Sequence, residues 1–383
     1  MSTIDPYLKR MAEKSASDMY FTPGAPPAIK IDGETWPVSK SPLNAELARK
    51  LAYSLMSEDQ QRDFEREMEM NLGFTREGIG RFRVNIYRQR GEVALVIRYI
   101  KAEIPPIEEL NLPDVLEALM LERKGLILVV GSTGSGKSTT LASMLDHRNA
   151  TRTGHILTIE DPIEYVFTHR KSIVGQREVG LDTLSYENAM REAMREAPDV
   201  IMVGEVRDRF TMESVISYAD TGHLALSTLH AVNTYQALDR VINMFPGESK
   251  NQILMDLSLN LKAVISQRLV PSKGRKRTRV PAVEIMLNTP YISELIRKGE
   301  INEIRGQIEK AGRDGMQTFD QSLYQMYQEG RIELETALDH ADSRTDLEWR
   351  VNFGGGAASY RGQGGGKSDR REQNESDELK LPE

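Results

Sequence analysis

Apolar residues run without interruption from Leu126 to Val130, which is typical of a strand that is buried on both faces of a parallel sheet. Further apolar segments predict strands at 155–160, 200–204 and 224–228. Amphipathic segments between them predict helices at 112–121, 137–148, 185–196, 212–219 and 234–243. This alternation of strand and helix predicts an α/β domain with a parallel, three-layer core.

Residues 80–100 follow a different pattern, with a period of two. Apolar side chains at even positions from 82 to 86 alternate with polar, largely basic side chains at odd positions from 81 to 87. A turn at Gly91 leads into a second such segment, so we predict a hairpin with one basic face. Together with helices predicted at 4–14, 41–55 and 57–70, the hairpin indicates an α+β N-terminal domain.

These patterns divide the chain into four parts. We predict an N-terminal domain at 1–102 and an interdomain linker at 103–110, where Pro105 and Pro106 cannot continue a helix. The α/β domain is predicted at 111–343, and from residue 249 to the mid-330s it is expected to be helical apart from a loop at 272–280. The Gly-rich, charged segment 344–383 predicts a disordered tail.

A glycine-rich loop follows the apolar run and matches the pattern G-x-x-x-x-G-K-[ST]. Backbone N–H groups of such a loop cradle phosphates, while the lysine pairs with the β and γ phosphates and the serine offers its hydroxyl to Mg²⁺. An ordinary turn is disfavoured, because a strand precedes the loop and a helix follows it. We therefore predict a nucleoside triphosphate and Mg²⁺ site formed by Gly131, Ser132, Thr133, Gly134, Ser135, Gly136, Lys137, Ser138 and Thr139.

Carboxylates that hold Mg²⁺ and orient water are also needed for hydrolysis. Glu160, Asp161 and Glu164 follow one predicted strand, and Glu205 follows another. Ligands of such sheets bind at the carboxyl ends of the strands, so all four side chains could reach the loop. The alternative is that they are acidic residues of surface loops.

His223 and His230 lie at the two ends of the predicted strand at 224–228. Their odd separation sends the two side chains to opposite faces, which argues against a shared metal ion. We expect them to sense or bridge phosphate. The alternative is a pair of hydrogen-bonded core histidines.

Composition narrows the class of protein. The 383 residues include no cysteine, which excludes disulfides and thiolate metal sites. The net charge of −7 gives no general attraction to nucleic acid or anionic lipid. No apolar run is long enough to span a bilayer, and the segment MSTIDPYLKRMAEKSASD lacks the apolar core of a signal peptide, so we expect a cytoplasmic protein.

The segments GSTGSGKST, TIEDPIEY, PDVIMVGEVRD and TGHLALSTLH, in this order, resemble the Walker A, Asp box, Walker B and His box of the secretion-superfamily hexameric ATPases. Over about residues 1–340 the chain is similar to the PilT/PilU family of type IV pilus retraction ATPases. The lack of cysteine favours this branch over relatives that carry a four-cysteine insertion. Residues 291–298, YISELIRK, keep only the core of the AIRNLIRE stretch of PilT-type members, which favours the PilU branch.

The resemblance implies a PAS-like N-terminal domain, a RecA-like ATPase domain and a homohexamer with ATP between the two domains. It also implies roles for particular residues. Lys137 and Ser138 would take the phosphates and Mg²⁺, Glu164 would be the catalytic glutamate, Glu205 would support Mg²⁺, His223 and His230 would lie near the γ-phosphate, and Arg83 and Arg98 match N-terminal-domain arginines that reach the nucleotide.

The function implied is an ATP-hydrolysing hexameric motor that powers type IV pilus retraction and twitching motility, peripheral at the inner membrane through a pilus platform protein. The alternative is a nucleotide-responsive accessory ring, which assists a primary motor of the same family and hydrolyses ATP weakly on its own. A nucleic-acid translocase is disfavoured, because the chain is acidic and lacks a stacking platform, so no nucleic-acid partner is expected.

Overall fold

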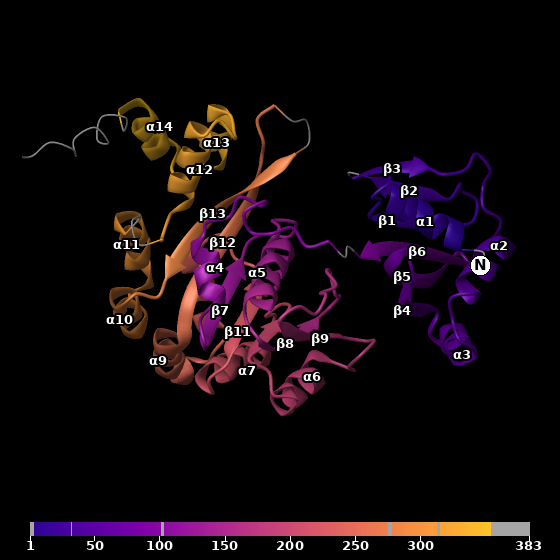
Figure 1. Ribbon diagram of the computed structural model, residues 1–383, viewed down its shortest axis with the longest axis horizontal. Coiled ribbons are helices and arrows are strands. Elements are labelled where there is room, and N and C mark those ends of the chain that lie inside the picture. Colours follow the sequence, from indigo (N-terminus) through magenta and orange to yellow (C-terminus); the bar gives the residue numbers. More distant parts are fainter. Residues whose placement is uncertain (1–3, 32, 101–102, 275–277, 312–314, 354–383) are drawn as a thin grey trace, which may run out of the picture.

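The computed structural model describes residues 4–31, 33–100, 103–274, 278–311 and 315–353. They form two domains, each built on its own sheet and joined through the segment around residue 103 (Figure 1). The N-terminal domain has an antiparallel six-stranded sheet, and the second domain has a seven-stranded sheet covered by helices. This confirms the predicted α+β domain followed by a P-loop α/β domain.

The N-terminal sheet has the strand order β3-β2-β1-β6-β5-β4. In β5 the side chains of Phe82, Val84 and Ile86 are fully buried, as the period of two predicts. A capping box between Ser57 and Gln60 begins α3. The elements of this domain are α1 (Asp5–Glu13), β1 (Asp18–Phe21), β2 (Ala28–Ile31), β3 (Glu34–Pro37), α2 (Ala45–Tyr53), α3 (Glu58–Glu67), β4 (Glu69–Arg76), β5 (Gly80–Gln89) and β6 (Glu92–Ile100).

The sheet of the second domain has the order β13-β12-β7-β11-β10-β8-β9. All neighbouring strands in it are parallel except the hairpin of β12 and β13. The carboxyl ends of β7, β8, β10 and β11 therefore lie side by side at the same end of the sheet. The strands are β7 (Gly125–Val130), β8 (Gly154–Glu160), β9 (Ser172–Glu178), β10 (Val200–Val203), β11 (Leu224–Leu229), β12 (Leu261–Pro271) and β13 (Arg279–Leu287).

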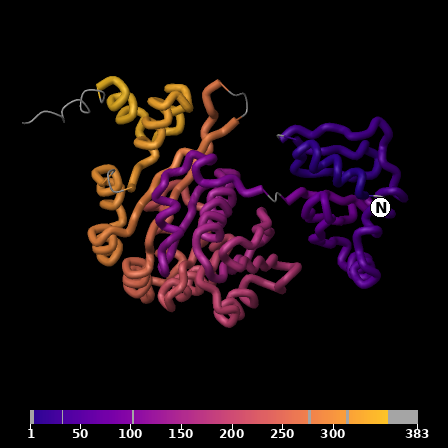
Figure 2. The backbone as a smooth tube through the Cα atoms, viewed as in Figure 1, coloured from indigo at the N-terminus to yellow at the C-terminus, as the bar shows by residue number. Residues whose placement is uncertain are grey.

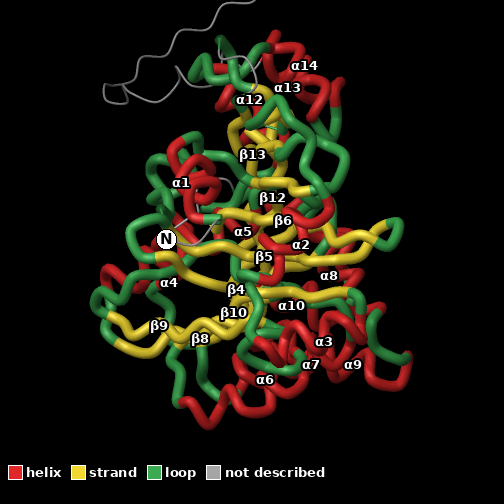
Figure 3. Tube along the Cα trace, turned by 90° about the vertical axis from the view of Figure 1, so that its right-hand side faces the viewer, coloured by secondary structure: helices red, strands yellow, loops and turns green. Residues whose placement is uncertain are grey.

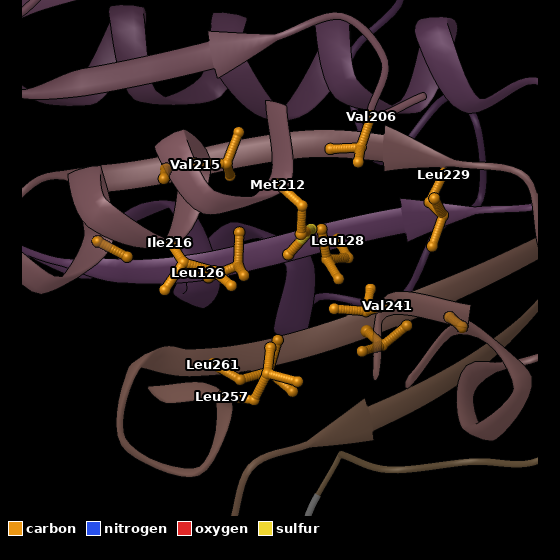
Figure 4. Close-up of a cluster of buried hydrophobic side chains, with 14 of the residues drawn as sticks. Leu126, Leu128, Val206, Met212, Val215, Ile216, Leu229, Val241, Leu257 and Leu261 are labelled. Carbon is orange, nitrogen blue, oxygen red and sulfur yellow. The ribbon is translucent and has the colours of Figure 1, made fainter. Parts of the chain in front are cut away.

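Helices cover both faces of this sheet, as the uninterrupted apolar strands require. Ile127 and Val129 of β7 face α4 and α5, whereas Leu126 and Leu128 face the helices on the other side (Figure 4). Each strand thus buries two apolar faces, which gives the three-layer core. The helices are α4 (Val115–Met120), α5 (Lys137–Thr151), α6 (Tyr186–Ala193), α7 (Arg209–Asp220), α8 (Thr234–Asn243), α9 (Lys250–Asn260), α10 (Pro290–Lys298) and α11 (Ile304–Lys310).

The long hairpin of β12 and β13 corrects the expectation that the chain is helical, apart from one loop, from residue 249 to the mid-330s. Its first strand, LKAVISQRLVP, mixes apolar and polar residues without a clear period of two, so the pattern alone does not distinguish a strand from a helix. Pairing with β7, for example Ser266 opposite Val130, decides in favour of the strand.

A third group of helices caps the far end of the hairpin, where Figure 2 shows the last turns of the chain. Phe319, Leu338 and Leu347 pack there against Val270 of β12. The helices are α12 (Phe319–Gln328), α13 (Leu334–His340) and α14 (Arg344–Phe353). The disordered tail was predicted to begin at residue 344, but its first ten residues form α14. The buried side chain of Leu347 and the ion pairs of Arg344 hold this helix in place. Residues 354–383 of that prediction lie outside the described residues.

The N-terminal domain lies against the edge of the second domain where the parallel strands end (Figure 3). Arg81 and Arg83 of β5 are each 3.9 Å from the buried carboxylate of Glu178 at the end of β9. Leu181 packs so closely on Gly73 that a Cβ at that glycine would lie 2.7 Å from its methyl group. Within the described part of the chain, no helix combines the length and the apolar character needed to cross a bilayer.

Candidate active site

A cleft of about 690 Å³ lies between the two domains, at the carboxyl ends of the parallel strands. The N-terminal domain contributes Asp18 and Arg98 to its walls. The second domain contributes the glycine-rich loop and the acidic ends of its strands. Predicted residues that line the cleft are Arg98, Thr133, Gly134, Gly136, Lys137, Ser138, Thr139, Glu160, Asp161, Glu164, Glu205 and His230.

The glycine-rich loop connects β7 to α5, as predicted. Gly136, the residue before α5, has a φ of +90°, a left-handed conformation that favours glycine. The Lys137 ammonium donates hydrogen bonds of 2.9 Å to the carbonyls of Gly131 and Ser132, and burial lowers its pKa. The loop thus presents one cation and the open N-terminus of a helix, which together suit a phosphate group.

Glu205 and His230 meet in the lining of the cleft, although they follow different strands. The two oxygens of the Glu205 carboxylate lie 2.8 Å from Nε2 of His230 and 2.8 Å from Nε of Arg207. Arg240 donates a 2.6 Å hydrogen bond to the His230 carbonyl, which fixes that loop. Arg207 was not predicted as a site residue, because the sequence shows it only as a basic residue two positions after an acid at a strand end.

The three acids of the Asp box differ in environment. Asp161 and Glu164 are exposed on the cleft wall, whereas Glu160 is buried. Glu160 accepts hydrogen bonds from Thr158 at 2.7 Å and from Gln176 at 3.3 Å. Burial raises the pKa of Glu160 to about 7, because the charged form loses its hydration. Of the three acids, Asp161 and Glu164 are therefore the two whose carboxylates are open to solvent in the cleft.

The two predicted arginines lie in different places. Arg98 of β6 lines the cleft, and its Nε is 2.9 Å from Asp18, whose hydrogen bond raises the guanidinium pKa. Arg83 lies beside Glu178 and is not among the described residues that line the cleft. The prediction that Arg83 reaches the nucleotide is therefore not met within one chain, because an ion pair with the second domain holds its side chain elsewhere.

His223 must also be corrected as a site residue. It precedes β11, at the amino end of the strand, and its ring lies near the carbonyl of Tyr218 and the hydroxyl of Thr221. His230 follows the other end of the same strand. The two histidines are seven steps apart along an extended chain, which corresponds to roughly 23 Å. The two ends of the His box therefore lie at opposite ends of β11, and only His230 lies at the carboxyl ends of the parallel strands.

The remaining loop residues, Gly131, Ser132 and Ser135, line a smaller cavity of about 300 Å³ behind the loop. Across the described part of the chain, no three His, Asp or Glu side chains gather closely enough to hold a metal. Mg²⁺ needs only one or two protein oxygens where phosphates supply the others. The hydroxyl of Ser138 and the carboxylate of Glu205, which line the same cleft, are oxygen donors of the kind that Mg²⁺ prefers.

Comparisons with known proteins agree with this architecture. Residues 2–339 match the family described as Type II/IV secretion system protein. The chain is 50% identical to the type IV pilus ATPase PilU of Pseudomonas aeruginosa over 347 residues, which are 91% of each chain. It is 42% identical to the type IV pilus retraction ATPase PilT of the same organism over 330 residues, which are 86% of this chain and 95% of PilT.

The fold is also similar to a crystal structure of the pilus retraction motor PilT with bound ADP. The two share 43% sequence identity with a TM-score of 0.84, over 91% of this chain and 99% of PilT. The cleft therefore belongs to a nucleotide-binding enzyme. We conclude that the chain belongs to the Type II/IV secretion system protein family and, within it, to the PilT/PilU family of pilus ATPases.

Proposed function

We propose that the protein is a hexameric motor that hydrolyses ATP to power type IV pilus retraction and twitching motility. The observation that carries this proposal is the composition of the cleft, in which Arg98 of one domain faces Lys137 and Glu164 of the other. A nucleotide bound there touches both domains. Its binding and hydrolysis would change the angle between them around residues 103–110, and the relatives PilT and PilU support the use of that change in pilus retraction.

The residues of the cleft divide the chemistry between them. Lys137 would neutralise the β and γ phosphates, and Ser138 with Glu205 would hold Mg²⁺, which when bound withdraws charge from the phosphate oxygens. His230 would keep Glu205 in place through the 2.8 Å contact. Glu164 would orient the attacking water, and Arg98 would stabilise charge that develops on the γ-phosphoryl oxygens.

The proposal extends to assembly and location. A ring of six chains, with domains at 1–102 and 111–343, would pass the change in angle from one subunit to the next. The ring would lie in the cytoplasm against an inner-membrane pilus platform protein, with a pilus retraction paralogue as a further partner and without nucleic acid. Arg83 could act in such a ring only after its ion pair with Glu178 opens.

A second candidate is an accessory ring that assists a primary retraction motor and hydrolyses ATP weakly on its own. The higher identity to PilU than to PilT favours it.

Steady-state ATP hydrolysis over a series of protein concentrations tests the motor. The wild type is compared with Glu164→Gln and with Glu300→Gln, an exposed glutamate outside the cleft lining. We expect the rate per chain to rise with concentration for the wild type and Glu300→Gln, and no turnover for Glu164→Gln. If the wild type binds ATP but turns over no faster than Glu164→Gln, the independent motor is refuted. A Glu164→Gln protein that still supports retraction in cells would favour the accessory role.

A further inference from the structure

Gln267 is a buried polar residue on a face of β12 where the two preceding side chains, Ala263 and Ile265, are apolar. It is 3% exposed, and those two apolar side chains pack against α5. Burying a side-chain amide is unfavourable unless its donor and acceptor both find partners. The partners of Gln267 are therefore informative.

Both partners of Gln267 belong to the phosphate-binding segment. Its Nε2 donates a 2.8 Å hydrogen bond to the carbonyl of Ser135, and its Oε1 accepts a 2.7 Å hydrogen bond from the hydroxyl of Thr140. Both bonds are buried. Lys137 and Ser138 lie between these two anchors, so one side chain fixes both ends of the turn that carries the phosphate and Mg²⁺ ligands.

The backbone of the loop also rests on Gln267. A Cβ at Gly136 would lie 2.6 Å from Nε2 of Gln267, and a Cβ at Gly131 would lie 2.5 Å from its backbone oxygen. Among the described residues, Gln267 belongs to the lining of the small cavity behind the loop rather than of the cleft. It therefore acts on the nucleotide only through the loop.

We propose that Gln267 is a positioning residue for ATP hydrolysis, which holds the Walker A loop in its phosphate-binding conformation before the nucleotide arrives. Without the amide, the Ser135 carbonyl and the Thr140 hydroxyl lose their buried partners, and the loop is free to turn toward water. The loop contacts the phosphates in the ground state and in the transition state alike. Its misplacement therefore raises KM for ATP more than it lowers kcat.

Two substitutions in the full-length protein separate this role from a structural one. Gln267→Leu removes both hydrogen bonds at nearly constant volume, and we expect kcat/KM to fall about a hundredfold, mainly through KM. Gln267→Glu keeps the acceptor for Thr140 but sets a carboxylate against the Ser135 carbonyl. When protonated, the introduced carboxyl group can donate to that carbonyl, as the amide does.

A pH profile then gives the decisive readout. We expect ADP to bind Gln267→Glu at least about tenfold more weakly than the wild type at pH 8.5, with the difference shrinking toward pH 6. The control is Tyr218→Phe, which removes a buried hydrogen bond from the tyrosine hydroxyl of α7 to the Met190 carbonyl of α6. Neither residue lines the cleft or the small cavity behind the loop. Tyr218→Phe should lower the unfolding midpoint and leave KM for ATP unchanged.

The proposal is overturned if a folded Gln267→Leu protein keeps the wild-type KM and ADP affinity. It is also overturned if Tyr218→Phe raises KM as much as Gln267→Leu does, or if Gln267→Glu binds ADP equally weakly at pH 6 and pH 8.5. Should Gln267→Leu fail to fold, the pH profile of Gln267→Glu decides alone.

Discussion

Glu160 makes the free energy of unfolding depend on pH in a way that one substitution can remove. Its carboxyl group is buried beside the cleft, and burial raises its pKa from 4.5 to about 7. Below pH 4.5 the group is protonated in both the folded and the unfolded chain. Between pH 4.5 and pH 7 the unfolded chain ionises first, so the folded state loses stability as the pH rises. Above pH 7 the loss is complete.

The size of this effect follows from the shift. Each pKa unit corresponds to about 1.4 kcal/mol, so the shift of Glu160 costs the folded state about 3 kcal/mol at high pH. Weighting by the ionised fractions leaves about 2.5 kcal/mol between pH 5 and pH 8. Glu160→Gln removes the titration, and its amide oxygen can still accept the hydrogen bonds from Thr158 and Gln176.

Urea unfolding of the nucleotide-free protein at several pH values measures the difference. We expect Glu160→Gln to gain about 2.5 kcal/mol relative to the wild type between pH 5 and pH 8. Glu300→Gln is the control, because this exposed glutamate lies outside the cleft lining and is not among the groups that shift the pKa of Glu160. The dependence on pH that Glu160 causes should remain in that variant. A flat profile for Glu160→Gln, or a gain that grows toward acid, would refute the account of Glu160.

Three further predictions follow from the placement of single residues. His223→Ala should leave kcat/KM for ATP unchanged while His230→Ala lowers it in the same ATPase assay, and equal losses would contradict their separation along β11. Glu178→Gln should weaken the ion pairs with the two arginines of β5 by about 1 kcal/mol, so limited proteolysis within 103–110 should become faster. An unchanged cleavage rate would show that these pairs do not hold the two domains together. Leu347→Ala should lower the free energy of local unfolding of α14 by about 2–4 kcal/mol, so amide hydrogen exchange should become faster in α14 but not in β7. Protection of α14 as in the wild type would show that Leu347 does not anchor this helix.

The nucleotide loop was predictable from the sequence because its chemistry is local. An apolar strand, a glycine turn and a helix start follow one another within residues 126–140, and only a few residue types can contact phosphate at that spacing. The acids at strand ends were predictable for a related reason, since parallel strands bring their carboxyl ends together. Glu160, Glu164 and Glu205 accordingly line one cleft.

Predictions that needed a partner from elsewhere in the chain were less successful. The pattern of β12 does not distinguish strand from helix until β7 is placed beside it. Arg83 carries the expected charge on the expected face, but Glu178, 95 residues later, determines where its side chain lies. His223 was predicted to be a site residue because it belongs to the His box. The six-residue strand β11 separates the two ends of that motif.

Gln267 shows why residues that support the phosphate loop from behind cannot be identified from sequence motifs. Its side chain meets the loop only because β12 pairs with β7 in one register, with Ser266 opposite Val130. A slip by one residue would turn the amide to the other face of the sheet and bring Ser266 or Arg268 under the loop in its place. The geometry at Lys137 therefore depends on a strand pairing formed more than a hundred residues away in sequence, as the hydrogen bond between Gln267 and Ser135 spans 132 residues. Residues that touch phosphate are constrained by chemistry and can be recognised from the sequence, whereas the residue that supports them is constrained by register and becomes visible only in the fold.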